Sequence, residues 1–421
     1  MIRRLEFAIV ALVLVIGAFS TGADFVFFLV YLGILAIGGG YVLTRFGLSD
    51  LEAGYSLDRR YAQVGDMLRA TYTVRNASRL PKLWLEVFNP STLPTPLPGR
   101  AISVGPRQER SWVARVPLVR RGHYQVDPMV VRTGDPFGLF ESSASVGSGT
   151  TVVVYPVAEV LTRWRLPPAS IEGSSTNPER TIQTSPLVTS VRGYVPGDAY
   201  NRIHWKSSAR HQELQVKEFE LEQTADVWLI LDLDSRVHTG SGDDATVETA
   251  VRVAASVSAR ALVDNRSVAM AAEGQRRVIL PVDRGARQHQ KVMQLLAAVQ
   301  PVGSTPLRDL LTDTLPRLRR GMTAVVITPS LDRSWIRPLT TLRTRGVVAV
   351  VILLDPSAHD QASLEGTGGL SPALVESRAH ALRALRYTLA EHELKSYVLV
   401  PRVPLADQMI TVGGRMAASV R

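Results

Sequence analysis

The sequence contains no cysteine among its 421 residues, and this absence excludes several kinds of chemistry. Disulfide bonds, thiolate zinc sites and cysteine nucleophiles all require a sulfur atom that the chain does not have. Histidine is scarce as well, and its scattered residues show no ligand spacing, such as two histidines on one helical face. We therefore expect solvated or packed side chains at His123, His238, His289, His359, His380 and His392.

The chain also lacks the motifs that usually accompany nucleic-acid binding, although its formal net charge is +10. The basic excess is nearly all arginine, spread along the chain, with no helix-turn-helix, zinc-finger spacing or RNA-binding aromatic motif. We therefore predict no nucleic-acid partner. Attraction to anionic lipid headgroups is a milder interpretation of the same charge, and it suits a membrane protein.

Two long apolar runs stand at the N-terminus, from Leu5 to Phe19 and from Phe25 to Leu43. About 20 residues span a bilayer core, so the second run is long enough and the first needs its flanks. The first run also resembles a signal peptide, but the second run follows it at once. The pattern predicts a two-helix membrane hairpin over residues 1–46.

The charges around the hairpin predict its orientation. Arg3 and Arg4 precede the first run and Arg45 follows the second, with only Asp24 between the runs. The positive-inside rule then places both ends of the hairpin in the cytoplasm. We expect a multi-pass protein of the inner or plasma membrane with cytoplasmic soluble domains. Residues 38–40, all glycine, either permit close helix packing or reflect the tolerance of glycine in membranes.

Residues 47–160 read as an all-β sandwich. Leu68, Ala70, Tyr72 and Val74 alternate with polar residues, which is the pattern of a half-buried strand. Similar short runs follow at 83–88, 111–118, 122–132 and 151–155, with no helical stretch between them. We predict about seven antiparallel strands and no catalytic constellation among them.

Beyond the sandwich, the pattern changes twice. Residues 161–225 form a linker and a signature segment, and 171–185 within them are polar and interrupted by proline, as in an exposed loop. From 226 to 402, apolar strands alternate with helical patterns, which predicts a doubly wound α/β domain with a mostly parallel sheet. Residues 403–421 are expected to be a C-terminal tail.

Four phrases carry a family resemblance. They are residues 134–140 (GDPFGLF), 154–156 (VYP), 192–198 (RGYVPGD) and 202–210 (RIHWKSSAR). In this order they resemble the bacterial domain-of-unknown-function 58 family, over nearly the whole chain. The family typically has glutamate where this chain has Gly193, so a role that rests on that acid is not carried over.

The resemblance implies a membrane-tethered sandwich followed by a von Willebrand factor A-like domain. It also implies a MoxR-type AAA+ ATPase as partner and a transglutaminase-like membrane protein as a second partner. The expected function is that of an adaptor or co-chaperone in membrane or cell-envelope protein assembly, not of an enzyme. The alternative is a hydrolase or metal-dependent enzyme that uses the region of His204 or Asp232.

The signature segment, residues 192–222, admits three interpretations. In the structural one, Asp198 and Arg202 tie the loop down and Trp205 packs beneath it. In the functional one, the segment is a docking surface for a partner, formed by Arg192, Tyr194, Asp198, Arg202, His204, Trp205, Lys206 and Arg210. In the third, Ser207 or Ser208 joins His204 and Asp198 in a catalytic triad, although no nucleophile elbow accompanies them.

The resemblance also raises a metal question, because metal-binding von Willebrand A domains hold magnesium with Asp-x-Ser-x-Ser and a later threonine. Here Asp232 and Asp234 are the candidate ligands and Thr305 matches the threonine, but Arg236 replaces the last serine. A guanidinium about 5 Å from a divalent ion would repel it by roughly 6 kcal/mol at an effective dielectric of ~20. The alternative is that Arg236 pairs with Asp232 or Asp234 in place of the metal.

Overall fold

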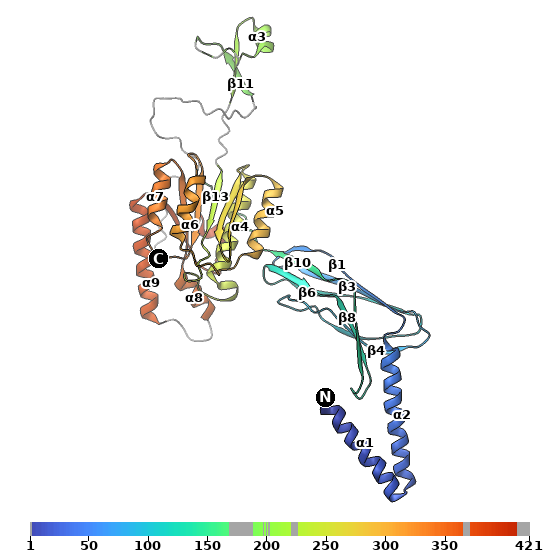
Figure 1. Ribbon diagram of the computed structural model, residues 1–421. Coiled ribbons are helices and arrows are strands. Elements are labelled where there is room, and N and C mark those ends of the chain that lie inside the picture. The colour runs from blue at the N-terminus through green and yellow to red at the C-terminus, as the bar shows by residue number, and fades with distance from the viewer. Residues whose placement is uncertain are drawn as a thin grey trace. The chain divides into compact units, whose positions relative to one another are not determined.

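The computed structural model describes residues 2–167, 188–196, 198, 200, 203–219, 226–364 and 371–410. The loop predicted at 171–185 and residues 411–421 of the predicted tail lie outside this range. The chain divides into two compact units. One comprises Met1–Val157 with Met293–Ala298, and the other comprises Ala158–Val292 with Val299–Arg421 (Figure 1). We describe each unit by itself.

Two helices begin the first unit, α1 (Ile2–Thr21) and α2 (Asp24–Gly47). Of the described helices, α2 is long and apolar enough to cross a membrane, whereas the apolar part of α1 is shorter, Ala11–Ser20. The helices touch near their connection, where the rings of Phe19 and Phe27 meet edge to face at 5.6 Å. The coarse prediction of an apolar N-terminal helix is therefore confirmed.

A β domain follows, with ten strands where the sequence predicted about seven. Its strands are β1 (Leu51–Leu57), β2 (Tyr61–Gln63), β3 (Met67–Asn76), β4 (Lys82–Phe88), β5 (Arg100–Val104), β6 (Glu109–Pro117), β7 (Gly122–Val126), β8 (Met129–Gly134), β9 (Glu141–Val146) and β10 (Thr150–Tyr155). They form three sheets, in the orders β1-β3-β6, β2-β10-β7 and β5-β4-β8-β9. The sequence count was low because β2, with three residues, is too short to show an alternating pattern and because the predicted run 122–132 contains two strands, β7 and β8.

One apolar core holds the β domain together. The alternation in β3 buries the predicted side chains, Leu68, Ala70, Tyr72 and Val74, each at most 1% exposed. They join buried residues from the other two sheets, among them Leu85 of β4 and Val152 of β10. Burial of this kind stabilises a fold by about 25 cal/mol per Å² of apolar surface.

The α/β domain has a six-stranded sheet in the order β15-β14-β13-β16-β17-β18. The strands are β13 (Val227–Leu231), β14 (Val268–Glu273), β15 (Arg277–Asp283), β16 (Thr323–Thr328), β17 (Val348–Leu354) and β18 (Lys395–Leu399). Neighbouring strands are parallel except for β14 and β15, and Val227 of β13 lies opposite Val268 and Thr323. The mostly parallel sheet agrees with the prediction.

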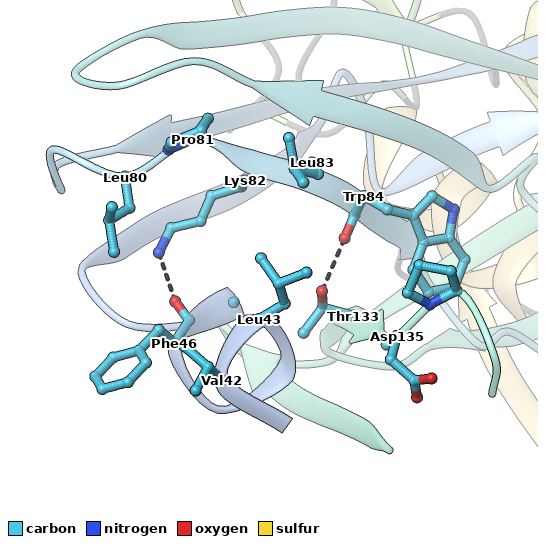
Figure 2. A pocket seen from close by; sticks show the side chains of 13 residues that line it. Val42, Leu43, Phe46, Leu80, Pro81, Lys82, Leu83, Trp84, Thr133 and Asp135 are labelled. Carbon is cyan, nitrogen blue, oxygen red and sulfur yellow. Dashed lines mark hydrogen bonds between the residues drawn. The ribbon is translucent and has the colours of Figure 1, made fainter. Parts of the chain in front are cut away.

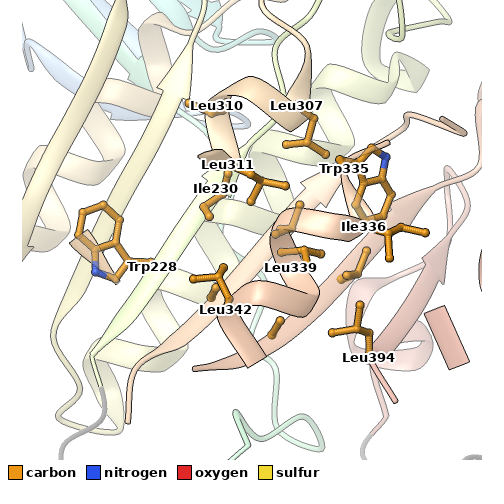
Figure 3. Packing of buried hydrophobic residues seen from close by; sticks show 14 of the residues in the cluster. Trp228, Ile230, Leu307, Leu310, Leu311, Trp335, Ile336, Leu339, Leu342 and Leu394 are labelled. Carbon is orange, nitrogen blue, oxygen red and sulfur yellow. The ribbon is translucent and has the colours of Figure 1, made fainter. Parts of the chain in front are cut away.

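Helices cover both faces of this sheet. They are α4 (Thr246–Val263), α5 (Ala286–Ala298), α6 (Leu307–Thr314), α7 (Ile336–Thr344), α8 (Pro356–Leu364), α9 (Pro372–Glu391) and α10 (Leu405–Gln408), with short 3-10 turns at Gly242–Asp244 and Leu315–Arg317. On one face, Trp228 and Ile230 pack among leucines of α6, α7 and α9 (Figure 3). Helix α4 contacts β13, β14, β16 and β17 but contributes nothing to that cluster, so it packs on the opposite face.

Part of the signature segment forms a small β-α-β motif. Strand β11 (Val188–Gly193) pairs antiparallel with β12 (Gln215–Phe219), and helix α3 (Trp205–His211) precedes β12. An isolated bridge joins Ile203 to Val216, and both side chains are 3% exposed. This contact is the apolar centre of the described part of the motif.

Candidate functional site

Two aspartates lie at the carboxyl end of β13, where the parallel sheet brings several strand ends together. Asp232 is 1% exposed. Its Oδ2 accepts a 2.6 Å hydrogen bond from the hydroxyl of Thr328, at the end of β16, and its Oδ1 accepts one of 3.1 Å from the backbone N–H of Asp234. Nε2 of His238 donates to the Asp232 carbonyl at 2.9 Å. The two groups that donate hydrogen bonds to the Asp232 carboxylate, a hydroxyl and a backbone N–H, are both uncharged.

The two carboxyl groups titrate in opposite directions. Burial raises the pKa of Asp232 to about 6, because removal of water penalises the charged form more than the hydrogen bond from Thr328 favours it. The guanidinium of Arg236 holds the pKa of Asp234 below its usual value. Below about pH 6 Asp232 holds a proton and the negative charge of the pair resides on Asp234, whereas at neutral pH both carboxyl groups are mostly ionised.

Arg236 occupies both oxygens of Asp234. Its Nε donates to Oδ1 at 2.9 Å and its NH2 group donates to Oδ2 at 2.6 Å, which is the bidentate geometry of a strong ion pair. The same NH2 group donates to the carbonyl of Ser304 at 3.1 Å, and the N–H of Ser235 donates to the carbonyl of Gly303 at 2.9 Å. The arginine therefore fastens the loop before α6 to the end of β13.

Thr305, the third predicted ligand, has a different partner. Its hydroxyl donates to Oε1 of Glu273 at 2.8 Å, and Oε2 of Glu273 accepts from Arg277 at 2.7 Å. Arg277 also pairs with Asp313. Glu273 was not among the predicted ligands, and Thr328 stands where the metal-binding motif would place its final aspartate. Each of the two ends a buried strand whose carboxyl end faces this site. That position at a strand end is the signal that would have found them.

The arrangement does not fit a divalent cation. Magnesium needs several free oxygen ligands in nearly octahedral geometry. Both oxygens of Asp234 accept hydrogen bonds from the guanidinium of Arg236, and the hydroxyl of Thr305 donates to Glu273. Among the described residues, no group of three or more His, Asp or Glu side chains is placed to hold a metal ion. Asp232 and Asp234 lie together as predicted, but Arg236 stands where the ion would be expected.

In the signature segment, a bidentate ion pair fixes the turn after β11. Arg192 donates two hydrogen bonds of 2.8 Å to the oxygens of Asp198, and the N–H of Val195 donates to the same carboxylate at 3.0 Å. Arg202, which was expected to share this role, lies outside the described residues. The predicted tie between loop and strand is therefore made by Arg192.

His204 caps a helix and does not take part in a triad. Its Nδ1 accepts from the N–H of Ser207 at 3.1 Å and lies 2.7 Å from the Ser207 hydroxyl. Ser208 instead binds the backbone, accepting from the N–H of Gln215 at 2.8 Å. The carboxylate of Asp198 is held by Arg192, and no hydrogen bond joins it to His204 in the part of the segment that the structure describes. In the described residues, therefore, Asp198, His204 and Ser207 do not form the hydrogen-bonded series of a catalytic triad.

The prediction that Trp205 packs beneath the loop was wrong. Trp205 is 67% exposed, and Tyr200 is 73% exposed and stacks on Tyr194 with ring centroids 6.1 Å apart. Lys206 and Arg210 of α3 are exposed as well. Ile203, one residue from the histidine cap, fills the buried position instead. The described part of the segment thus presents aromatic rings and cations to solvent.

These features define a class of chain with an apolar N-terminal helix, a β domain, and an α/β domain preceded by a small aromatic motif. Residues 190–369 match the model of the family described as "Protein of unknown function DUF58". This match confirms the resemblance over the signature segment and most of the α/β sheet.

Relatives support the same grouping. The uncharacterized protein YeaD of Bacillus subtilis is 27% identical over 310 residues, which cover 71% of this chain and 73% of YeaD. The uncharacterized protein Rv1480 of Mycobacterium tuberculosis is 31% identical over 172 residues, 39% of this chain and 54% of that protein. The chain thus matches about half of the mycobacterial relative. Among solved structures, a CARDB domain from Pyrococcus furiosus is 15% identical to this chain. The match covers 25% of this chain and 92% of that domain, with a TM-score of 0.19.

Proposed function

We propose that this chain is a membrane-anchored protein-interaction module and that the motif around Tyr200 and Trp205 docks its partner. The observation that carries the proposal is the exposure of both aromatic rings, 73% and 67%, on a motif with a small buried centre. Tyrosine and tryptophan dominate the energetics of protein interfaces, and a pair of them left in water marks a binding surface more often than a folding element.

The charges beside the rings support an acidic partner surface. Lys206 and Arg210 lie on α3 with exposed side chains. Such cations accelerate association with an acidic surface and select against basic ones. The Arg192–Asp198 ion pair braces the turn that precedes Tyr200, so less conformational entropy is lost on binding.

The family resemblance suggests the partner. We infer a MoxR-type AAA+ ATPase, for which the chain acts as adaptor or co-chaperone in membrane or cell-envelope protein assembly. A transglutaminase-like membrane protein is the second candidate. The strand order of the α/β sheet, with one antiparallel edge strand, supports a von Willebrand factor A-like domain, a fold that functions here by binding and not by catalysis.

The proposed anchor is a two-helix hairpin. Helix α2 meets the length and composition of a span, and α1 has 20 residues and contacts α2 through Phe19. Arg45 at the end of α2 favours a cytoplasmic position for the domains that follow. The module would then be a multi-pass protein whose soluble domains work at the cytoplasmic face of the membrane.

Removal of both rings is expected to abolish partner recovery. In a pull-down of the tagged full chain from native membranes, Tyr200→Ala with Trp205→Ala should weaken ATPase binding about 30-fold or more, since one hot-spot side chain contributes about 2 kcal/mol. Tyr387→Ala is the matched control, because Tyr387 is also 73% exposed but lies on α9. Recovery of no ATPase by the wild type, or equal loss in the control, would count against the proposal.

The enzyme alternative has less support, because the described residues near His204 and Asp232 do not form a hydrogen-bonded acid, base and nucleophile. It predicts that the purified chain turns over a substrate in a hydrolase panel and that His204→Ala removes the activity. His204→Asn keeps a residue that can cap the helix but removes the imidazole. Turnover by the wild type that both His204→Ala and His204→Asn lose would replace the interaction hypothesis with the enzymatic one.

A further inference from the structure

Helix α2 is packed against the β domain over its last two turns. Its buried residues are Gly40, Thr44 and Gly47, which lie on one face of the helix. A Cβ atom on Gly40 would come within 3.0 Å of the Cβ of Asp135, and one on Gly47 within 2.6 Å of Thr133. The absence of side chains at Gly40 and Gly47 therefore lets β8 and the turn after it approach the helix closely.

This packing leaves a short free helix. Residues 24–39 precede the contact, and at about 1.5 Å per residue these sixteen residues extend about 24 Å. A bilayer hydrocarbon core is about 30 Å thick and needs about 20 residues. Since Asp135 already lies beside Gly40, a bilayer of ordinary thickness around α2 must also reach the turn between β8 and β9.

The β8–β9 turn, residues 134–140, has internal hydrogen bonds that suit it to the membrane interface. The carboxylate of Asp135 accepts hydrogen bonds from the N–H groups of Phe137 and Phe140, and the Asp135 carbonyl accepts from Gly138 at 3.1 Å. Asp135 is 8% exposed, and Gly138 has a φ of +69° that glycine adopts without strain. The internal hydrogen bonds matter because unsatisfied backbone groups are costly in lipid.

Several apolar side chains in and beside the turn are exposed, whereas Leu139 is 8% exposed and the acid that follows the turn, Glu141, pairs with Arg132 at 3.2 Å. Phe137 is 46% exposed, and the ring of Tyr41 meets that of Phe140 at 5.6 Å. The start of β4 adds Leu83 and Trp84, 64% and 45% exposed. Aromatic residues of this kind gather where a membrane protein crosses the lipid headgroups.

An apolar pocket of about 590 Å³ lies between α2 and the start of β4 (Figure 2). Val42, Leu43 and Phe46 of α2 line one side, and Leu80 and Leu83 line the other. The pocket is continuous with the apolar surface of the membrane-spanning helix, so the chemistry that fits it is a hydrocarbon chain from the same bilayer.

Lys82 closes the pocket toward the β domain. Its Nζ donates to the carbonyl of Phe46 at 2.6 Å, at the end of α2, and the residue is 3% exposed. The hydroxyl of Thr133 donates to the carbonyl of Trp84 at 2.8 Å. Both contacts satisfy polar groups that would otherwise face hydrocarbon. The first joins α2 to β4, and the second joins β8 to β4.

We propose that the β8–β9 turn and residues 80–84 are immersed in the cytoplasmic interface of the bilayer, and that a phospholipid acyl chain occupies the pocket between residues 80–84 and α2. This inference rests on the proposed membrane anchor. The inference also gives the motif at residues 134–140 a role beyond that of a turn. Asp135 accepts hydrogen bonds from the backbone N–H groups of the turn, so that Phe137 can enter lipid.

The absence of native cysteine makes a direct test possible, because any introduced cysteine is the sole labelling site. The full chain carrying Phe137→Cys or Leu83→Cys is labelled with a nitroxide in vesicles of equimolar phosphatidylcholine and phosphatidylglycerol. Collision rates with oxygen, which concentrates in lipid, and with a hydrated nickel chelate then report depth. Leu35→Cys on α2 is the lipid reference, and Val113→Cys on β6, apolar and 49% exposed, is the aqueous control.

The proposal predicts an oxygen-to-nickel collision ratio at Phe137 and Leu83 that exceeds the ratio at Val113 by about tenfold, since hydrocarbon excludes the charged chelate. Water-like ratios at both positions with a lipid-like ratio at Leu35 would overturn this inference and leave the anchor intact. A water-like ratio at Leu35 would instead refute the anchor itself. A lipid-like ratio at Phe137 alone would retain the immersed turn and refute the acyl chain in the pocket.

Discussion

Arg236→Ser is expected to turn a site that rejects divalent cations into one that binds them. In the wild type the guanidinium occupies both oxygens of Asp234. Its charge also opposes a divalent ion, with part of the repulsion screened by water because the Arg236 side chain is 62% exposed. The substitution removes this charge and frees Asp234 beside Asp232.

Calorimetric titration of magnesium and manganese into the detergent-solubilised chain measures the effect. We expect no binding heat with the wild type and saturable binding with Arg236→Ser, lost again when Asp232→Ala and Asp234→Ala are added. Arg308→Ser is the matched control, because Arg308 pairs with its neighbour Asp309 on an exposed surface. Wild-type binding that disappears in the Asp232→Ala, Asp234→Ala variant would show that the ion displaces Arg236 and that the geometric argument is wrong.

Asp232→Asn is expected to gain stability over the wild type as the pH rises. Burial raises the pKa of Asp232 to about 6 from its ordinary value of 3.8. A raised pKa means that the folded state binds the proton more tightly, so the wild type loses stability between pH 4 and pH 6 and no further above. The difference between the two pKa values corresponds to about 3 kcal/mol of stability. Asparagine does not titrate, and the variant avoids this loss.

The measurement compares variant and wild type at each pH from 4 to 8, through the protection of β13 and β16 amides against hydrogen exchange. A constant offset from the altered hydrogen bond with Thr328 is removed by following only the change with pH. Asp234→Asn is the control. Its native carboxyl has a lowered pKa because of Arg236, so its protonation falls below the measured range and that variant should keep a constant offset from the wild type from pH 4 to pH 8. Equal pH profiles for both variants would contradict the assignment of charge within the pair.

Much of the secondary structure could be predicted because each element shows its period locally. The buried alternation of Leu68 to Val74 and the strand Thr323–Thr328 follow from side-chain pattern alone. The helical patterns predicted between the strands of residues 226–402 include α4, Thr246–Val263. Helix α8 was missed, since its residues carry little apolar periodicity. Local pattern therefore predicted which elements exist better than how many strands the β domain contains.

The site could be predicted only in part, because it depends on which side chains meet across strand ends. Asp232 and Asp234 were identified from their spacing, but the sequence left open whether Arg236 points toward them or away. The structure favours the ion pair, with Arg236 on Asp234. Thr305 matched the expected motif in sequence, yet its hydroxyl reaches Glu273, a residue 32 positions earlier. Contacts over such separations are not encoded in any local spacing.

In the signature segment, the sequence did not predict which side chains are buried. An aromatic residue such as Trp205 is usually buried, and that expectation placed it beneath the loop. In the described part of the motif, the buried side chains are those of Ile203 and Val216, each 3% exposed, whereas Trp205 is 67% exposed. The hydrophobicity of a residue therefore did not predict which side chain is buried, and the exposure of Trp205 is what makes it a candidate for recognition.

The central claim is that this exposed surface docks an ATPase at the membrane, and site-specific crosslinking tests it most directly. A photoreactive amino acid replaces Trp205 in the full chain in native membranes, and replaces Tyr387 on α9 as the control position. The account predicts a covalent adduct with a AAA+ ATPase from position 205 and none from position 387. Absence of an ATPase adduct at position 205, or equal adducts at both positions, would contradict it.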